Sequence, residues 1–458
     1  MTDPFTAAVA SRVDTARTKH LCPEISWGVV ANGELVAHGG TPERVFRIAS
    51  MTKSFTAAAV LSLRDEGVLS LDVPVAEYAP ELTPVRGPAG SAEVTLRHLL
   101  SMTSGLATDD PWADRHLDIS EAEVDEVYAA GPLFARRPGE AFEYSNLGFG
   151  VIGRVVRRVT GRPVQEHVSE RLLEPLGMRR TTWVQPVHDD WARPHRVRDG
   201  ASIPDPDPVL GDGEIAPMGG LWTTVADLAR WVAWLDAAVA RPDDSASVGL
   251  STASRREMQR QHTYAGATEL AGRRCPSGYG FGLLVRDDPT VGTLVGHSGG
   301  LPGYGSNMRW CSGRGVGAIA LANTTYAPMS ELTMQMLDAL HGAGLVPMSL
   351  SPGAESRFDL DGMARRLVAL LDDWSDAEAD TLFADNVALD DPLERRATEA
   401  RDRVTAHGRL RVTEVTATTR AAATVRVMAD DGATFTISML LAPFGEPRVQ
   451  QYTVTTAP

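Results

Sequence analysis

The sequence contains little cysteine, and the few thiols follow no recognisable pattern. Cys22, Cys275 and Cys311 are the only three in 458 residues. They are too few and too scattered for a disulfide framework, and none lies in a C-x-x-C pair or beside a histidine at metal-ligand spacing. We therefore expect three buried thiols without chemistry, no metal site and no cofactor.

Long apolar runs are also missing. No segment approaches the ~20 uninterrupted apolar residues of a membrane span, and the N-terminal stretch lacks a basic leader followed by an apolar run. We expect a cytoplasmic protein. The formal net charge of −15, from 59 acidic and 44 basic residues, would repel nucleic acid and anionic membranes. A small-molecule or short-peptide partner is favoured, and a homo-oligomer remains open.

Lysine is the rarest charged residue. Of 44 basic residues only Lys19 and Lys53 are lysines, so arginine supplies nearly every positive charge. Lys19 lies near the end of a helix expected over residues 4–20, and chance explains it. For Lys53 a chemical reason is worth seeking, because a lysine side chain can lose its proton in a protein and an arginine cannot.

What the sequence does contain is the pattern of an antiparallel sheet interrupted by helices. Strand-like runs begin at Glu24 and Glu34 and are joined by the hairpin signal Asn32-Gly33. From about residue 50 to 234 apolar residues recur at three-to-four spacing, which indicates helices, and short strands return after about residue 276. These patterns predict an α/β (α+β) domain over residues 1–347, in which helices flank an antiparallel sheet and an all-helical subdomain is inserted.

Three other stretches differ from this pattern. The loop over residues 196–214 is the most irregular and could border a site. Residues 348–358 are predicted to form a linker. Residues 359–458 are predicted to form a small α+β module, with helices near 359–374 and 393–406 and four alternating strands from Leu410 to about Thr456. The helix-then-strand order weakly resembles nuclear transport factors and ketosteroid isomerases, and we expect a structural or dimerising role.

The stretch "FRIASMTKSFT" places Ser50 at the first turn of a helix, with Lys53 three residues later on the same face. A desolvated lysine with a lowered pKa can take the proton of such a hydroxyl, and the positive end of the helix favours an oxyanion. The alternative is that Ser50 merely caps the helix, because serine is a preferred N-cap residue. A Ser-x-x-Lys pattern also occurs by chance in roughly one chain in ten of this composition. Ser50 and Lys53 are therefore candidates for nucleophile and base.

The stretch "EYSNLGFG" places Tyr144 and Asn146 at the foot of another helix. A phenol can relay a proton, and an amide can bind a substrate carbonyl or the lysine. Taken alone, the tripeptide has a plainer explanation, because asparagine is a preferred N-cap and a tyrosine before a helix usually packs.

The stretch "VGHSGG" admits two interpretations. Its G-x-S-x-G pattern would make Ser298 a nucleophile on a strand-to-helix turn. The glycine- and proline-rich "GGLPGYG" that follows makes an immediate helix implausible. The other interpretation is a strand ending at a site, where His297 offers a polar group, Gly299 lets a substrate approach and Gly300 presents its N–H to an oxyanion.

Ser50-x-x-Lys53, Tyr144-x-Asn146 and His297-x-Gly299 follow the order and approximate spacing of the motifs of penicillin-recognising serine enzymes. The chain resembles the class C β-lactamases, D-alanyl-D-alanine carboxypeptidases, D-aminopeptidases and related esterases over residues 5–345. By that resemblance Ser50 would be acylated, Lys53 and Tyr144 would move its proton, and Asn146, His297 and Gly299 would hold the substrate. The backbone N–H groups of Ser50 and Gly300 would form the oxyanion hole.

The third motif departs from the Lys-Thr-Gly that is usual in class C β-lactamases. A histidine is only partly charged near neutral pH, so a weaker hold on a substrate carboxylate is expected. The sequence thus predicts a serine hydrolase that acts through an acyl-Ser50 intermediate on an ester or amide, perhaps one that bears a D-residue. The alternatives are an acyltransferase of the same fold and a penicillin-binding-type sensor or scaffold without turnover.

Overall fold

A computed structural model describes residues 3–187, 190–206, 209–240, 248–347, 358–443 and 445–456. The chain divides into two compact units, Met1–Ser349 and Leu350–Pro458. The linker predicted over 348–358 falls almost entirely outside the described residues. In the part of the chain that is described, no helix is long and apolar enough to cross a lipid bilayer.

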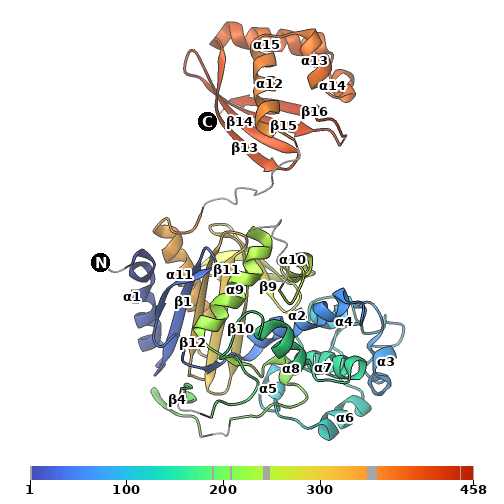
Figure 1. Cartoon of the computed structure of the whole chain (residues 1–458), viewed down its shortest axis with the longest axis vertical. Coiled ribbons are helices and arrows are strands. Elements are labelled where there is room, and N and C mark those ends of the chain that lie inside the picture. Colours follow the sequence, from blue (N-terminus) through green and yellow to red (C-terminus); the bar gives the residue numbers. More distant parts are fainter. Residues whose placement is uncertain are drawn as a thin grey trace. The chain divides into compact units, whose positions relative to one another are not determined.

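The first unit is built on an eight-stranded antiparallel sheet with the order β2-β1-β12-β11-β10-β9-β8-β7 (Figure 1). The chain forms two strands, leaves the sheet and returns to it, as the sequence predicts. The strands are β1 Ile25–Ala31, β2 Glu34–Gly39, β7 Thr263–Leu270, β8 Arg273–Tyr279, β9 Leu284–Asp288, β10 Gly292–Leu301, β11 Tyr304–Cys311 and β12 Val316–Ala322.

Helices cover both faces of this sheet, so β1, β11 and β12 are buried along their whole length. Helices α1 (Pro4–Lys19) and α11 (Met329–Gly342) pack together on one face, and Lys19 pairs with Glu331 at the surface. Helix α9 (Val225–Ala240) crosses the other face (Figure 1), and α10 (Thr252–Met258) packs against α9. Each face has its own apolar core.

An inserted helical region follows β3 (Phe46–Arg47), a short strand that pairs with β6 (Trp222–Thr223). Its α-helices are α2 Thr52–Asp65, α3 Val75–Tyr78, α4 Leu96–Leu100, α5 Asp110–Ala113, α6 Glu121–Ala130, α7 Leu147–Thr160 and α8 Val164–Val168. Shorter turns are the 3-10 helices η1 Ala49–Met51, η2 Pro80–Leu82 and η4 Ala216–Met218, and the π-helical η3 Ser169–Leu173.

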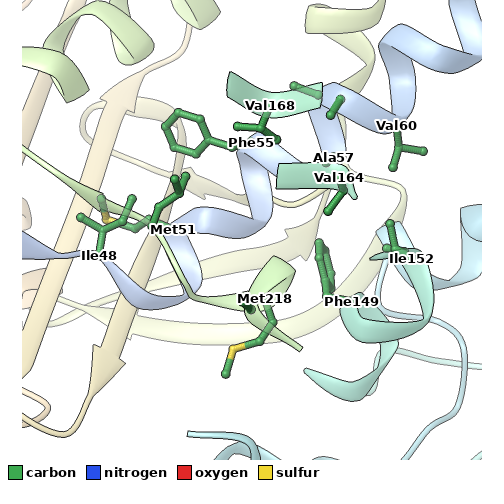
Figure 2. Close-up of a cluster of buried hydrophobic side chains, with 14 of the residues drawn as sticks. Ile48, Met51, Phe55, Ala57, Val60, Phe149, Ile152, Val164, Val168 and Met218 are labelled. Carbon is green, nitrogen blue, oxygen red and sulfur yellow. The ribbon is translucent and has the colours of Figure 1, made fainter. Parts of the chain in front are cut away.

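Helix α2 passes through the centre of this region and is buried on all sides from Thr52 to Leu63. Phe55, Ala57 and Val60 of α2 lie among apolar side chains of α7 and α8 (Figure 2). A helix fixed on every side cannot shift without disturbing a close-packed core, so the residues at its first turn are held firmly in place.

Two features of the first unit differ from the sequence prediction. The sheet resumes at β7, about a dozen residues before residue 276, because β7 is an edge strand whose half-buried residues give no strong apolar signal. The loop over 196–214 contains part of a hairpin, formed by β4 (His195–Arg198) and β5 (Ala201–Pro204) around Asp199-Gly200. Both turn residues have positive φ, which suits a two-residue hairpin.

The second unit is a four-stranded antiparallel meander with the order β13-β14-β15-β16 and with helices packed on it. Its strands are β13 Leu410–Thr419, β14 Ala422–Ala429, β15 Thr434–Leu441 and β16 Val449–Thr456, and its helices are α12 Leu360–Asp372, α13 Asp376–Leu382, α14 Asp385–Asp390 and α15 Leu393–His407. The two long helices and four strands were predicted, whereas the two short helices were not.

Candidate active site

Ser50 lies in the turn η1, directly before α2. The preceding residue, Ala49, has φ +48°, a left-handed conformation that costs a non-glycine residue ~1 kcal/mol. Such strain is concentrated at functional sites, where the surrounding structure enforces it. Ser50 itself is partly exposed, although its neighbours Ala49 and Met51 are buried. The Ser50 hydroxyl is thus presented at the N-terminal end of a buried helix.

Lys53 is fully buried, one turn along from Ser50. Its Nζ lies 2.9 Å from Ser50 Oγ, 2.6 Å from Asn146 Oδ1 and 3.0 Å from the Met218 carbonyl oxygen. Burial lowers the pKa of Lys53 to about 8, against the attraction of nearby aspartates. A substantial neutral fraction therefore exists near physiological pH.

These three partners determine where a neutral Lys53 can direct its lone pair. The carbonyl oxygens of Asn146 and Met218 accept hydrogen bonds and cannot donate them. A neutral amine has two N–H groups, and these satisfy the two carbonyls. The described contacts of Nζ also include the Met218 sulfur at 4.0 Å, which is a weak acceptor. Among these described partners only the Ser50 hydroxyl has a proton to give, so the lone pair is left for it. The geometry suits transfer of the Ser50 proton to Lys53.

Asn146 lies at the start of α7, but its side chain does not cap that helix. The capping is done by Asp109, whose carboxylate accepts the N–H groups of Asn146 and Leu147, each at 2.7 Å. The Asn146 amide is thereby free for other partners: Oδ1 accepts from Lys53, and Nδ2 donates to Asp110 Oδ1 at 2.6 Å.

Tyr144 is partly buried beside the same pair. Its ring lies 4.9 Å from Lys53 Nζ. Burial raises the pKa of Tyr144 well above its ordinary value, and a hydrogen bond with the Ser50 side chain acts in the opposite direction. Tyr144 is therefore a neutral phenol within reach of Ser50, suited to relaying a proton rather than holding a negative charge.

His297 lies on β10 and is buried. Its Nδ1 donates to the Ser298 carbonyl oxygen at 2.6 Å, and its Nε2 accepts from the Tyr279 hydroxyl at 2.9 Å. Burial, followed by repulsion from Lys53, lowers the pKa of His297 to about 3. The ring is thus neutral rather than partly charged near pH 7, and a substrate contact through either nitrogen would replace one of these two bonds.

The glycines after His297 let β10 approach η1. A Cβ on Gly299 would lie 2.1 Å from the Ile48 carbonyl oxygen, and one on Gly300 would lie 2.7 Å from the Tyr326 ring. Strand β9 pairs with β10 only as far as Gly296, so the continuation of β10 beside η1 is not paired on that edge by β9.

Comparison with known proteins places this site in a family. A family model described as Beta-lactamase matches residues 9–343. The chain belongs to the beta-lactamase family. The resemblance inferred from the three motifs is thereby confirmed, and so is the fold predicted with it.

Three relatives show how far the likeness extends. The chain is 32% identical to the esterase EstB of Burkholderia gladioli, over 73% of this chain and 96% of EstB. It is 31% identical to penicillin-binding protein 4 of Amycolatopsis lactamdurans, over 76% of this chain and 93% of that protein. The solved structure of an octameric penicillin-binding protein homologue from Pyrococcus abyssi matches with a TM-score of 0.64 and 21% identity, over 99% of this chain and 96% of the other.

The beta-lactamase fold also decides between the two interpretations of "VGHSGG". Ser298 lies inside β10, which continues through a hairpin into β11 and not into a helix. Its hydroxyl accepts from Asn307 Nδ2 at 2.9 Å. Ser298 therefore does not lie on the strand-to-helix turn that exposes the nucleophile in G-x-S-x-G enzymes, and this match does not mark a nucleophile.

Three aspartates near Lys53 were not predicted from the sequence. Asp109 and Asp110 hold the start of α7 and the Asn146 amide, and Asp114 accepts a hydrogen bond from the Tyr326 hydroxyl at 2.9 Å. Burial raises the pKa of Asp114 to about 6. Among the described residues no group of three or more histidine, cysteine or acidic side chains is arranged to hold a metal ion.

Tyr279 and Met218 were also missed. Tyr279 ends β8, and only its contact with His297 across the sheet reveals its place in the site. Met218 contributes a backbone carbonyl, which no side-chain pattern can indicate. The one available signal was the stretch "PMGGLWTTVADLARW", which resembles a family signature.

Proposed function

We propose that this beta-lactamase-family serine hydrolase cleaves an ester or amide of a small substrate through an acyl-Ser50 intermediate. The observation that carries the proposal is the set of partners around Lys53 Nζ, which leaves the lone pair of the neutral amine for the Ser50 hydroxyl. Lys53 is the base, and Tyr144 relays the proton.

In the acylation step, Ser50 Oγ forms a bond to the substrate carbonyl carbon while its proton passes to Lys53. The oxyanion that develops accepts hydrogen bonds from the backbone N–H groups of Ser50 and Gly300. The intermediate collapses by breaking the bond to the leaving group, which takes up the proton through Tyr144. Water then attacks the acyl carbonyl carbon and gives up a proton to Lys53 and Tyr144. The bond from the acyl carbon to Ser50 Oγ breaks, Oγ takes up the proton, and the acid is released.

An ester is favoured over a β-lactam as the substrate. The neutral His297 provides no fixed positive charge for the carboxylate of a penicillin. The aspartates close to Lys53 add negative potential in the same region. Asn146, His297 and Gly299 are proposed to line the position of the acyl group.

The test uses a fluorophosphonate and intact-mass analysis. One adduct is expected on the wild-type chain and none on Ser50→Ala. Ser298→Ala is the matched control, because Ser298 is the serine of the competing motif, and it should label fully. Full labelling of Ser50→Ala would refute the proposal. Multiple turnover of p-nitrophenyl esters would separate the hydrolase from a sensor, and product partition with an added amine would reveal an acyltransferase.

A further inference from the structure

The orientation of the Asn146 amide decides what Lys53 can do. With Oδ1 towards Nζ, as observed, the amide uses up one N–H of the neutral lysine. With the amide reversed, its NH₂ group would face Nζ and donate to the lone pair. The lone pair of Lys53 would then accept a hydrogen bond from Asn146 and would not be available for the Ser50 proton.

The amide oxygen and nitrogen have nearly the same shape, so packing alone does not choose between the two orientations. The choice is made by the group on the far side of the amide. That group is the Asp110 carboxylate, which accepts from Asn146 Nδ2 at 2.6 Å. An ionised carboxylate only accepts hydrogen bonds, so a reversed amide would bring two oxygens together at this place.

Given the proposed function, we infer that Asp110 is a positioning residue that holds the Asn146 oxygen towards Lys53 and so reserves the lysine lone pair for Ser50. Asp110 is the first residue of α5, and Asp109 beside it caps α7. The two neighbouring carboxylates therefore have separate tasks. Asp109 fixes the backbone of Asn146, and Asp110 fixes the direction of its side chain.

The variant Asp110→Asn tests this role with little change in shape. An asparagine can accept from or donate to Asn146, so it no longer opposes the reversed amide. A neutral amine accepts a hydrogen bond more strongly than it donates one, so the reversed amide, which donates to the Lys53 lone pair, becomes the favoured one. Replacing a charged by a neutral acceptor typically weakens a hydrogen bond by an amount that corresponds to about a tenfold change. We expect the rate constant of Ser50 acylation, measured near pH 9 where Lys53 is neutral in every variant, to fall about tenfold.

Asp114→Asn is the matched control. This variant also removes one negative charge from the surroundings of Lys53. In the wild-type chain, however, the Asp114 carboxylate accepts a hydrogen bond from Tyr326 and not from Asn146. Both variants lower the pKa of Lys53, because a negative charge that stabilised the ammonium is gone, so both should shift the acid limb of the rate profile to lower pH. Only Asp110→Asn should also lower the plateau at high pH.

A double-mutant cycle with Asn146→Ala completes the test. If Asp110 acts through the amide, Asp110→Asn should cause no further loss of the plateau rate in the Asn146→Ala background. An equal loss in both backgrounds, or a plateau within twofold of wild type in the single variant, would overturn the inference. Thermal melting of each variant excludes misfolding. Absence of a Ser50 adduct on the wild-type chain would instead refute the proposed function.

Discussion

The lowered pKa of Lys53 makes a quantitative prediction about pH. An ordinary lysine has a pKa of about 10.5, whereas burial brings that of Lys53 to about 8. At pH 7 the neutral fraction is then about one in ten rather than roughly one in three thousand, a gain of about 300-fold in available base. The same shift means that burial disfavours the ammonium by ~3 kcal/mol, which the fold must supply.

The acylation rate at low substrate concentration should therefore rise tenfold per pH unit below pH 8 and level off above it. Lys53→Arg should reduce the rate by at least about a thousandfold, because arginine keeps its proton. Lys19→Arg, at the only other lysine, is the control and should leave the rate unchanged. Stopped-flow acylation by an activated ester between pH 5.5 and 9.5 measures both. A flat profile, or more than a tenth of the rate in Lys53→Arg, would show that Lys53 is not the base.

Three further predictions concern neighbouring residues. Asp114→Asn should raise the free energy of unfolding at pH 8 by about 1–3 kcal/mol and have little effect below pH 4. The raised pKa of Asp114 means that its ionised form destabilises the folded state, and that form is absent at low pH. Urea titrations at the two pH values check this. His297 should remain neutral from pH 5 to 8, so its ring signals, assigned in NMR spectra with His297→Gln, should not titrate; a midpoint near 6.5 would contradict the structure. Gly299→Ala should destabilise the protein by about 1–3 kcal/mol and slow acylation, because its Cβ would collide with the Ile48 carbonyl, whereas Gly342→Ala, where nothing lies within 4 Å, should melt like wild type.

The sequence predicts most of the fold because its signals are local. The hairpin at Asn32-Gly33, the helix that carries Ser50 and Lys53, and the four strands after Leu410 each follow from a periodicity or a turn signal within a short window. The edge strand β7 was missed because an exposed edge needs no apolar run.

A contact in the site can be predicted from the sequence only where both residues lie within one short stretch of the chain. Ser50 and Lys53 are one turn apart, so their contact follows from helix geometry. The contact between Lys53 and Asn146 spans 93 positions, and family resemblance rather than periodicity brings the two motifs together. The contact between Asn146 and Asp110 has no signal in the sequence, since an aspartate before a proline usually indicates a turn or a helix start. The neutral state of His297 depends on burial and on repulsion from Lys53, which lies far from it in the sequence.

The near-absence of lysine has a practical consequence. Amine-reactive reagents attack neutral, accessible amines, and of the two lysine side chains one is sealed in the core while Lys19 is more than half exposed on α1. Coupling to a surface or dye through lysine should therefore select Lys19, on the face of the sheet that α1 and α11 cover. Turnover should therefore survive a lysine modification that inactivates enzymes with accessible catalytic lysines.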